Sequence, residues 1–377
     1  MSSMPIYLLQ TLILGLVLLR LTSSGTTALR WHIVAWILLT SVIFLRYGSA
    51  EQLIFYSSDQ KYHVYLVQRI LDGSDWKNFS WWFLDSRAPY TVPAAVLSLI
   101  GIDTALALKT VSLGYFLGTV SFIRTIATSA GLKLRISTLF MTATGPIGVL
   151  FASLALRETA MMFFVLHAIR GASPTHRILA FCMLGLLRPH LAAALLLGMA
   201  IVGLVRSLRN NDSSWHPITA FISMISGAVL GSILFAIGSS LRDGTRFSLS
   251  TFFSIQPIAR IASNFVGLQF LAAPDGTVAL SIADLLFARL LLSETILIPL
   301  LFTLVILTSR GMDRHSQLAL WSFSIYIGLA TNTDNNSFRQ NLPLMPMMGI
   351  TVLQMLQSRH QPKLYSKLVR MRAETSD

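Results

Sequence analysis

The sequence predicts an all-α integral membrane protein, a polytopic bundle of about 10–12 transmembrane or re-entrant helices. Composition points to this class, because the 377 residues are 54% hydrophobic and 12% charged, with a mean hydropathy of +0.65. A soluble domain carries about 25% charged residues, so this chain has about half of the usual polar coat. No long hydrophilic stretch could fold as a separate soluble domain. The single cysteine, Cys182, excludes an internal disulfide and a cysteine metal cluster.

Apolar runs long enough for a membrane helix recur along the chain. They are 5–22, 31–47, 104–123, 136–155, 217–240, 286–308, 316–331 and 342–356. Shorter apolar runs cover 90–101, 157–169 and 178–187, and the run 190–205 follows directly. Short runs are typical of re-entrant segments, or of half-crossings that meet a water-filled cavity. We therefore expect one bundle over 1–357 and a basic cytoplasmic tail over 358–377.

Lysine and arginine set the expected orientation, because short cytoplasmic loops are enriched in them. More than half of the 29 basic residues fall in the tail or in every second connection. Those in the connections are Arg20, Arg30, Arg124, Lys133, Arg135, Arg170, Arg177, Arg206, Arg209, Arg310 and Arg314. The outer loops are then 48–89, 241–285 and 332–341. This orientation also requires 90–101 to dip into the membrane and return to the same side.

Arginines that interrupt apolar sequence are candidate ligand residues, because a charge inside a bilayer is costly. Arg157 interrupts one apolar stretch, Arg188 and His190 interrupt a second, and Arg339 lies four residues before Pro343. On the expected topology all of them face outward. Several arginines around one outer cavity would bind a phosphate or pyrophosphate through bidentate hydrogen bonds. Taken singly, each arginine also fits a side chain that reaches from a helix end to the membrane surface.

Asp59 and His63 are the candidate catalytic residues in the first outer loop. A carboxylate there could act as a general base toward a sugar hydroxyl, or help to hold a metal. The alternative is a helix cap, in which Ser57, Ser58 or Asp59 begins a surface helix that runs through Arg69. His63 follows Asp59 by four residues and would share its helical face. Two such residues are too few to define a metal site, so none is expected.

Several function classes lack support in the sequence. It contains no Walker motif, no dinucleotide-binding glycine fingerprint, no HExxH and no GxSxG, so no cofactor is expected. The net charge of +13 would suggest nucleic acid in a soluble protein. In a membrane protein it holds the chain against anionic lipid, so membrane lipids and not nucleic acids are the expected partners.

Three segments resemble a known family. The segment 45–48 (Leu-Arg-Tyr-Gly), followed by Asp59 and then a tyrosine, resembles polytopic polymerases of exopolysaccharide and O-antigen repeat units, the Wzy and EpsG-like group. The segment 154–160 resembles the arginine at the start of a middle helix in that group, and His190 resembles its lone histidine. The resemblance implies polymerisation of repeat units from a polyprenyl-linked sugar donor at the outer face of the inner (plasma) membrane. It also implies other envelope polysaccharide assembly proteins as partners.

Two alternatives stay open. Asp59, the segment 187–189 and the segment 339–343 also fit a GT-C-type glycosyltransferase, which uses a polyprenyl-phosphate sugar. The chain could instead be a transporter or flippase for a lipid-linked glycan, with arginines that bind the headgroup while no bond is made. Transporters usually show internal repeats with matched helix breaks, and no matched halves occur in this sequence.

The alternation of basic loops predicts that the tail after residue 357 is cytoplasmic and that 48–89 lies outside. A reporter that fluoresces only in the cytoplasm should be active when fused after residue 377 and silent when inserted at residue 73. The opposite pattern would overturn this topology.

Overall fold

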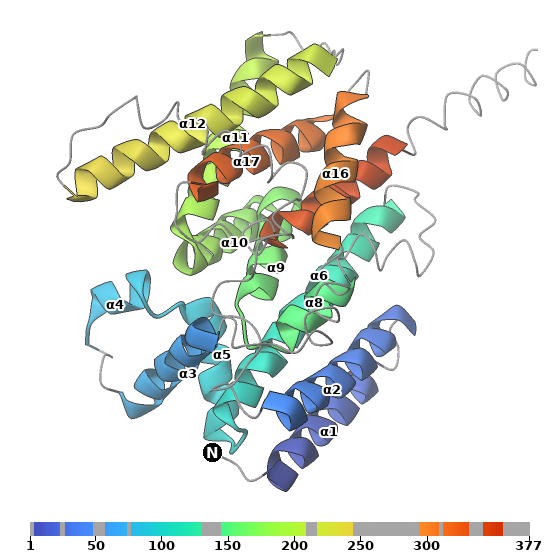
Figure 1. The fold of residues 1–377 in the computed structure, drawn as a ribbon, viewed down its shortest axis with the longest axis vertical. Coiled ribbons are helices and arrows are strands. Elements are labelled where there is room, and N and C mark those ends of the chain that lie inside the picture. The colour runs from blue at the N-terminus through green and yellow to red at the C-terminus, as the bar shows by residue number, and fades with distance from the viewer. Residues whose placement is uncertain are drawn as a thin grey trace, which may run out of the picture.

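The computed structural model describes residues 4–22, 27–47, 57–73, 77–129, 145–208, 217–243, 294–308, 312–331 and 342–356. Within these ranges every regular element is a helix and no strand occurs, so the prediction of an all-α fold is confirmed for them. Figure 1 shows α1, α2 and α6 side by side at one end of the molecule, and α11, α12 and α17 packed together at the other.

The helices follow one another with short connections. Their bounds are α1 (Met4–Leu21), α2 (Thr27–Tyr47), α3 (Ser57–Asp72), α4 (Phe79–Leu84), α5 (Ala88–Leu99), α6 (Thr104–Ser129), α8 (Gly145–Ala152), α9 (Glu158–Arg170), α10 (Pro174–Leu187), α11 (Pro189–Leu208), α12 (Pro217–Asp243), α16 (Glu294–Leu307) and α17 (Arg314–Thr331). A 3₁₀ turn, η3 (Leu342–Leu344), opens the last described helix, which ends at residue 356.

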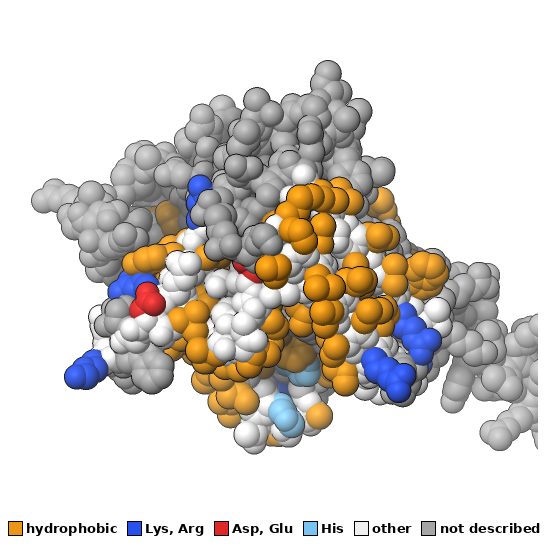
Figure 2. Space-filling model, turned by 90° about the horizontal axis from the view of Figure 1, so that it is seen from below, with side chains coloured by type: hydrophobic (Ala, Val, Ile, Leu, Met, Phe, Trp, Pro, Cys, Tyr) orange, Lys and Arg blue, Asp and Glu red, His pale blue; other side chains and the backbone are white. Residues whose placement is uncertain are grey.

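Four of the described helices are long and apolar enough to cross a bilayer, which suggests membrane association. They are Met4–Leu21, Thr104–Ser129, Pro189–Ser207 and Ile218–Ile237. Large apolar side chains of α1, such as Leu9 and Leu16, are more than half exposed. Figure 2 shows hydrophobic side chains over much of the described surface on that face, with lysine and arginine toward its margins. The expected number of spans stays a prediction.

Helices α6 and α9 run parallel, because the contacts between them keep the same order along both helices. Ser112 Oγ donates to the Leu156 carbonyl at 2.9 Å, just before α9 begins. Further along, the rings of Phe122 and His167 stack with centroids 4.1 Å apart. Both helices therefore finish at the same end of the bundle.

The N-terminal pair adopts the matching direction. Lys109 Nζ donates to Tyr7 Oη at 3.0 Å, and the Tyr7 ring stacks on Phe44 at 3.9 Å. Helix α1 therefore begins, and α2 ends, beside the early turns of α6. Arg20 and Arg30, at the other ends of α1 and α2, lie toward the end where α6 finishes.

Helices α10, α11 and α17 complete the same pattern. Arg157 Nη1 donates to the Leu187 carbonyl at 2.6 Å, so α10 returns antiparallel to α9. Arg206 Nε donates to Gln317 Oε1 at 3.4 Å, so α11 ends where α17 begins. The sequence grouped these loops by charge, and the packing brings their helix ends together. We call this end the basic end; its described residues are Arg20, Arg30, Arg124, Arg170, Arg177, Arg206 and Arg314.

Helix α5 differs from the dip expected over 90–101. Residues 88–99 form one continuous helix antiparallel to α6. Tyr115 Oη, midway along α6, donates to the Pro89 carbonyl at 2.6 Å, whereas Ser98 lies beside Thr104 at the start of α6. The chain is therefore already deep in the bundle when α5 begins, and 90–101 supplies only the return. An Ala-Pro start is pre-organised for a helix, so the turn can begin there.

Helices α12 and α17 pack closely through glycine. A side chain at Gly231 would collide with the Ile325 carbonyl, and one at Gly328 would collide with the Ala228 carbonyl. A Cβ on Gly227 would lie 2.7 Å from Ser324 Cβ. Gly227 and Gly231 form the small-xxx-small pattern that lets two helix backbones approach within a membrane.

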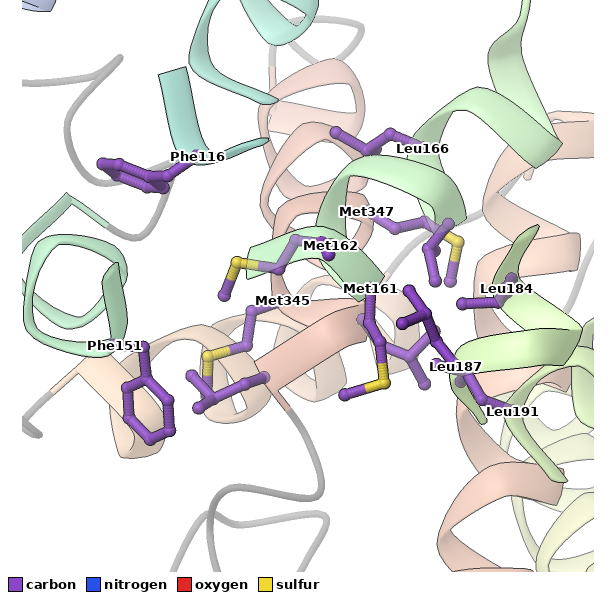
Figure 3. Close-up of a cluster of buried hydrophobic side chains, with 14 of the residues drawn as sticks. Phe116, Phe151, Met161, Met162, Leu166, Leu184, Leu187, Leu191, Met345 and Met347 are labelled. Atoms are coloured by element: carbon purple, nitrogen blue, oxygen red, sulfur yellow. The ribbon is translucent and has the colours of Figure 1, made fainter. Parts of the chain in front are cut away.

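The core of the described fold is centred on α9. Met161 and Met162 are fully buried and meet Met345 and Met347 of the last described helix (Figure 3). Methionine is unbranched and fills irregular gaps between helices. The break before α9 is therefore held in place by helices from both halves of the chain.

Close packing at Gly231 predicts opposite effects of one substitution at two positions. Gly231→Ala should destabilise the protein by about 1–3 kcal/mol, because the added methyl forces the α12 and α17 backbones apart. Gly203→Ala on α11 meets no atom within 4 Å and should be neutral or slightly stabilising, as alanine usually is in a helix. Thermal unfolding in detergent measures both. Equal melting temperatures for the two variants would contradict the packing.

Candidate functional site

The candidate site is built on an interruption of helical structure between α8 and α9, residues 153–157, which we call the α8–α9 break. Ala155 adopts a left-handed φ of 52°, which costs a residue with a Cβ about 1–2 kcal/mol. The backbone carbonyls beside the break lack their helical partners, and side chains of three helices supply donors. Trp36 Nε1 of α2 donates to the Ala152 carbonyl at 3.3 Å, and Ser112 of α6 donates to that of Leu156.

His63 of α3 supplies the third donor. Its Nδ1 lies 3.2 Å from the Ala155 carbonyl, and its Nε2 lies 2.8 Å from Arg87 Nη1. Arginine only donates, so Nε2 must accept, and Nδ1 carries the proton that the carbonyl accepts. The geometry therefore assigns a neutral His63 with the Nδ1–H tautomer. In this arrangement both ring nitrogens are engaged, and the ring positions Arg87.

Arg87 was not among the site residues expected from the sequence. It immediately precedes α5 with a left-handed φ of 53°, and its guanidinium lies 4.7 Å from the centroid of the Tyr62 ring. Non-glycine residues held at positive φ cluster at functional sites, because the surrounding structure must over-determine them. A signal was present in the sequence, namely a charged residue directly before the Ala-Pro start of an apolar helix.

Arg157 and Glu158 join the break to the start of α9. Arg157 Nη1 donates to the Leu187 carbonyl, which places the guanidinium at the C-terminal end of α10 beside Arg188. Glu158 is fully buried in the first turn of α9, where the helix dipole favours a negative charge. This buried carboxylate is a second polar residue that sequence reasoning noticed but did not assign to the site.

Arg188 and His190 lie at the turn between α10 and α11. Arg188 is extended, with its guanidinium 5.8 Å from the centroid of the Tyr326 ring of α17. Arg188 and Arg157 both act electrostatically on His190. The structure thus brings together three of the four predicted donor-binding residues. Arg339 lies outside the described residues.

Asp59 lies in the first turn of α3 and is partly buried, one helical turn before His63. The expectation that both share one face of a helix agrees with the observed helix. The side chains of Ser57 and Ser58 are outside the described part, so the capping alternative is untested.

The polar cluster, defined as His63, Arg87, Arg157, Arg188 and His190, lies away from the basic end. Ser112 contacts the break and is eight residues into α6, so the break lies about 12 Å along that helix from its start. Beside it, a cavity of about 550–560 Å³ is lined by Pro89 of α5, Tyr115 of α6, Phe163 of α9 and Leu179 of α10. Its lining is largely apolar and begins directly after Arg87.

No protein family, no curated protein and no solved structure matches the chain. The class that the described residues define is a helical protein with membrane-type apolar helices and a polar cluster around a broken helix. The resemblance to repeat-unit polymerases therefore stays an expectation, and the functional argument is carried by the geometry.

The two hydrogen bonds of His63 predict a large effect of removing its ring. His63→Ala leaves the Ala155 carbonyl without its donor and opens a cavity, which should cost about 2–4 kcal/mol of folding stability. His63→Asn should restore part of the loss, because its amide nitrogen can take the place of Nδ1. His176→Ala, at an exposed histidine, is the control for thermal unfolding. A His63→Ala protein as stable as this control would rule out the proposed bridge.

Proposed function

We propose that this chain is a multi-pass protein of the inner (plasma) membrane that transfers or polymerises glycan from a polyprenyl-linked donor at the outer face. The observation that carries the proposal is the convergence of Arg87, Arg157 and Arg188 on the α8–α9 break, away from the basic end. Under the positive-inside rule the basic end faces the cytoplasm, so the polar cluster opens toward the outside.

The polar cluster suits the phosphates of the donor. A guanidinium binds phosphate oxygens through two parallel hydrogen bonds, and its charge does not depend on pH. When the acceptor hydroxyl attacks the anomeric carbon, the bond from that carbon to the phosphate oxygen breaks and negative charge grows on the phosphate. Arginines fixed near that oxygen stabilise the transition state more than the ground state.

The proton of the attacking hydroxyl is taken by Asp59 in this proposal. A positioned general base contributes roughly 10²–10⁴-fold to the rate. His63, the other residue expected to act as a base, positions Arg87 through Nε2 and could accept the proton only after Arg87 moves away.

The apolar cavity beside α5 suits the carrier chain. It begins at Ala88 and Pro89, immediately after Arg87, and continues past Phe164 and His167 along α9 toward the basic end. A donor with its phosphates in the polar cluster would therefore direct its first isoprene units toward the middle of the bilayer. A GT-C-type enzyme with a polyprenyl-phosphate sugar would use the same arrangement.

Transport without chemistry is the second candidate, and the α8–α9 break favours it. Transporters bind substrates near discontinuous helices whose unwound carbonyls and helix ends line the site. A lipid-linked glycan transporter or flippase would use the same arginines to hold the phosphates.

The proposal predicts graded losses of glycan synthesis when purified protein is incubated with lipid-linked oligosaccharide. Arg188→Lys keeps the charge but loses the planar fork, so activity should fall by about tenfold or more. Asp59→Asn should lower turnover by about 10²-fold or more with little change in donor binding. Chain length on gels and lipid-donor binding are measured on the same samples.

Arg124→Lys is the matched control, because Arg124 is an exposed arginine at the basic end. It should retain full activity. If Arg157→Ala, Arg188→Ala and Asp59→Asn all still made full-length glycan at normal membrane levels, the enzymatic function would be wrong. Donor binding without chain growth in the unmodified protein would favour transport.

A further inference from the structure

A second cavity, of about 550 Å³, lies at the basic end between α9, α10, α11 and α17. Arg177 and Arg314 stand at one side of it, and Phe181, Leu196 and Met199 form an apolar wall. It is distinct from the polar cluster, since none of that cluster's five residues lines it. The cavity therefore combines two guanidinium groups with a hydrocarbon-like surface.

The arginines supply a lasting positive charge. Arg177 Nε donates to the Gly171 carbonyl at 2.8 Å, which anchors its guanidinium at the start of α10. Arg314 is exposed at the first residue of α17. His315, next to it, adds no charge at neutral pH, because burial, together with Arg170, lowers its pKa to about 4. The charge on this rim therefore comes from arginine alone.

The apolar wall opens to the outside of the bundle. Ile178 is 65% exposed and Leu196 is 54% exposed, and both line the cavity. Ile178 directly follows Arg177 on α10, and Leu196 lies about three turns before the end of α11. Charge lies at the helix ends and apolar surface lies along the helices, as in a molecule with an anionic head and a hydrocarbon chain.

We propose that this cavity binds an anionic phospholipid of the inner leaflet. Its phosphate lies between Arg177 and Arg314, and the first part of one acyl chain lies against Phe181 and Met199. Basic pockets between membrane helices on the cytoplasmic side bind anionic lipid headgroups in this way. The inference requires the membrane orientation but not glycosyl transfer, so it stands or fails separately from the enzymatic proposal.

Cys182 allows a test in the unmodified protein, because it is the single cysteine of the chain, is exposed and lines the cavity. Its rate of reaction with N-ethylmaleimide is measured in a neutral detergent with added dioctanoyl phosphatidylglycerol. At ten times the dissociation constant the lipid should slow labelling about tenfold, since only the unoccupied fraction reacts. Dioctanoyl phosphatidylcholine and inorganic phosphate should each have little effect.

Arg314→Glu should abolish the protection by reversing one charge at the rim. The variant should fold, because glutamate is favoured in the first turn of a helix. Arg124→Glu changes an exposed arginine at the same end that does not line the cavity, and should keep the protection. Equal protection by phosphatidylcholine, protection by inorganic phosphate alone, or protection that survives in Arg314→Glu would each overturn the proposal.

Discussion

The constraint on which the rest of this structure depends is the demand of buried backbone carbonyls for donors. A carbonyl away from water and without a hydrogen bond costs about 1–3 kcal/mol. The α8–α9 break creates such carbonyls among buried residues, and Trp36, His63 and Ser112 reach them from α2, α3 and α6. Irregular backbone at membrane depth is tolerated only where protein or a water-filled cavity covers it. The break therefore fixes how these three helices pack around α9.

The same hydrogen bonds organise the polar cluster. Because Nδ1 of His63 donates to the Ala155 carbonyl, its Nε2 is left as an acceptor and orients Arg87. A protonated His63 would present a second donor to Arg87, so the neutral ring belongs to the folded arrangement. Arg157 follows the break by two residues, and its contact with the Leu187 carbonyl brings it beside Arg188. Backbone satisfaction and the placement of the arginines are thus one structural problem.

Much of the architecture could be predicted from the sequence, because apolar runs and basic loops are local signals. Arg157 and Arg188 stood out as charges inside apolar runs, and the structure places them side by side. The role of His63 could not be predicted, because its partners lie 24 and 92 residues away. Arg87 was missed because a left-handed backbone is invisible in a sequence without glycine at that position. The course of α5 was misjudged because depth depends on the contact between Tyr115 and Pro89.

Helix α9 has a mechanical consequence. It carries Arg157 immediately before its first residue and Arg170 as its last, about 20 Å apart along a stiff rod. Arg170 donates to Gln354 at 2.7 Å and lies near His315 on the wall of the cavity at the basic end. Between the two ends, α9 rests on methionines, whose unbranched side chains adapt to small displacements at little cost in contact. An axial shift imposed at either end of α9 is therefore transmitted to the other, linking events on the two sides of the membrane.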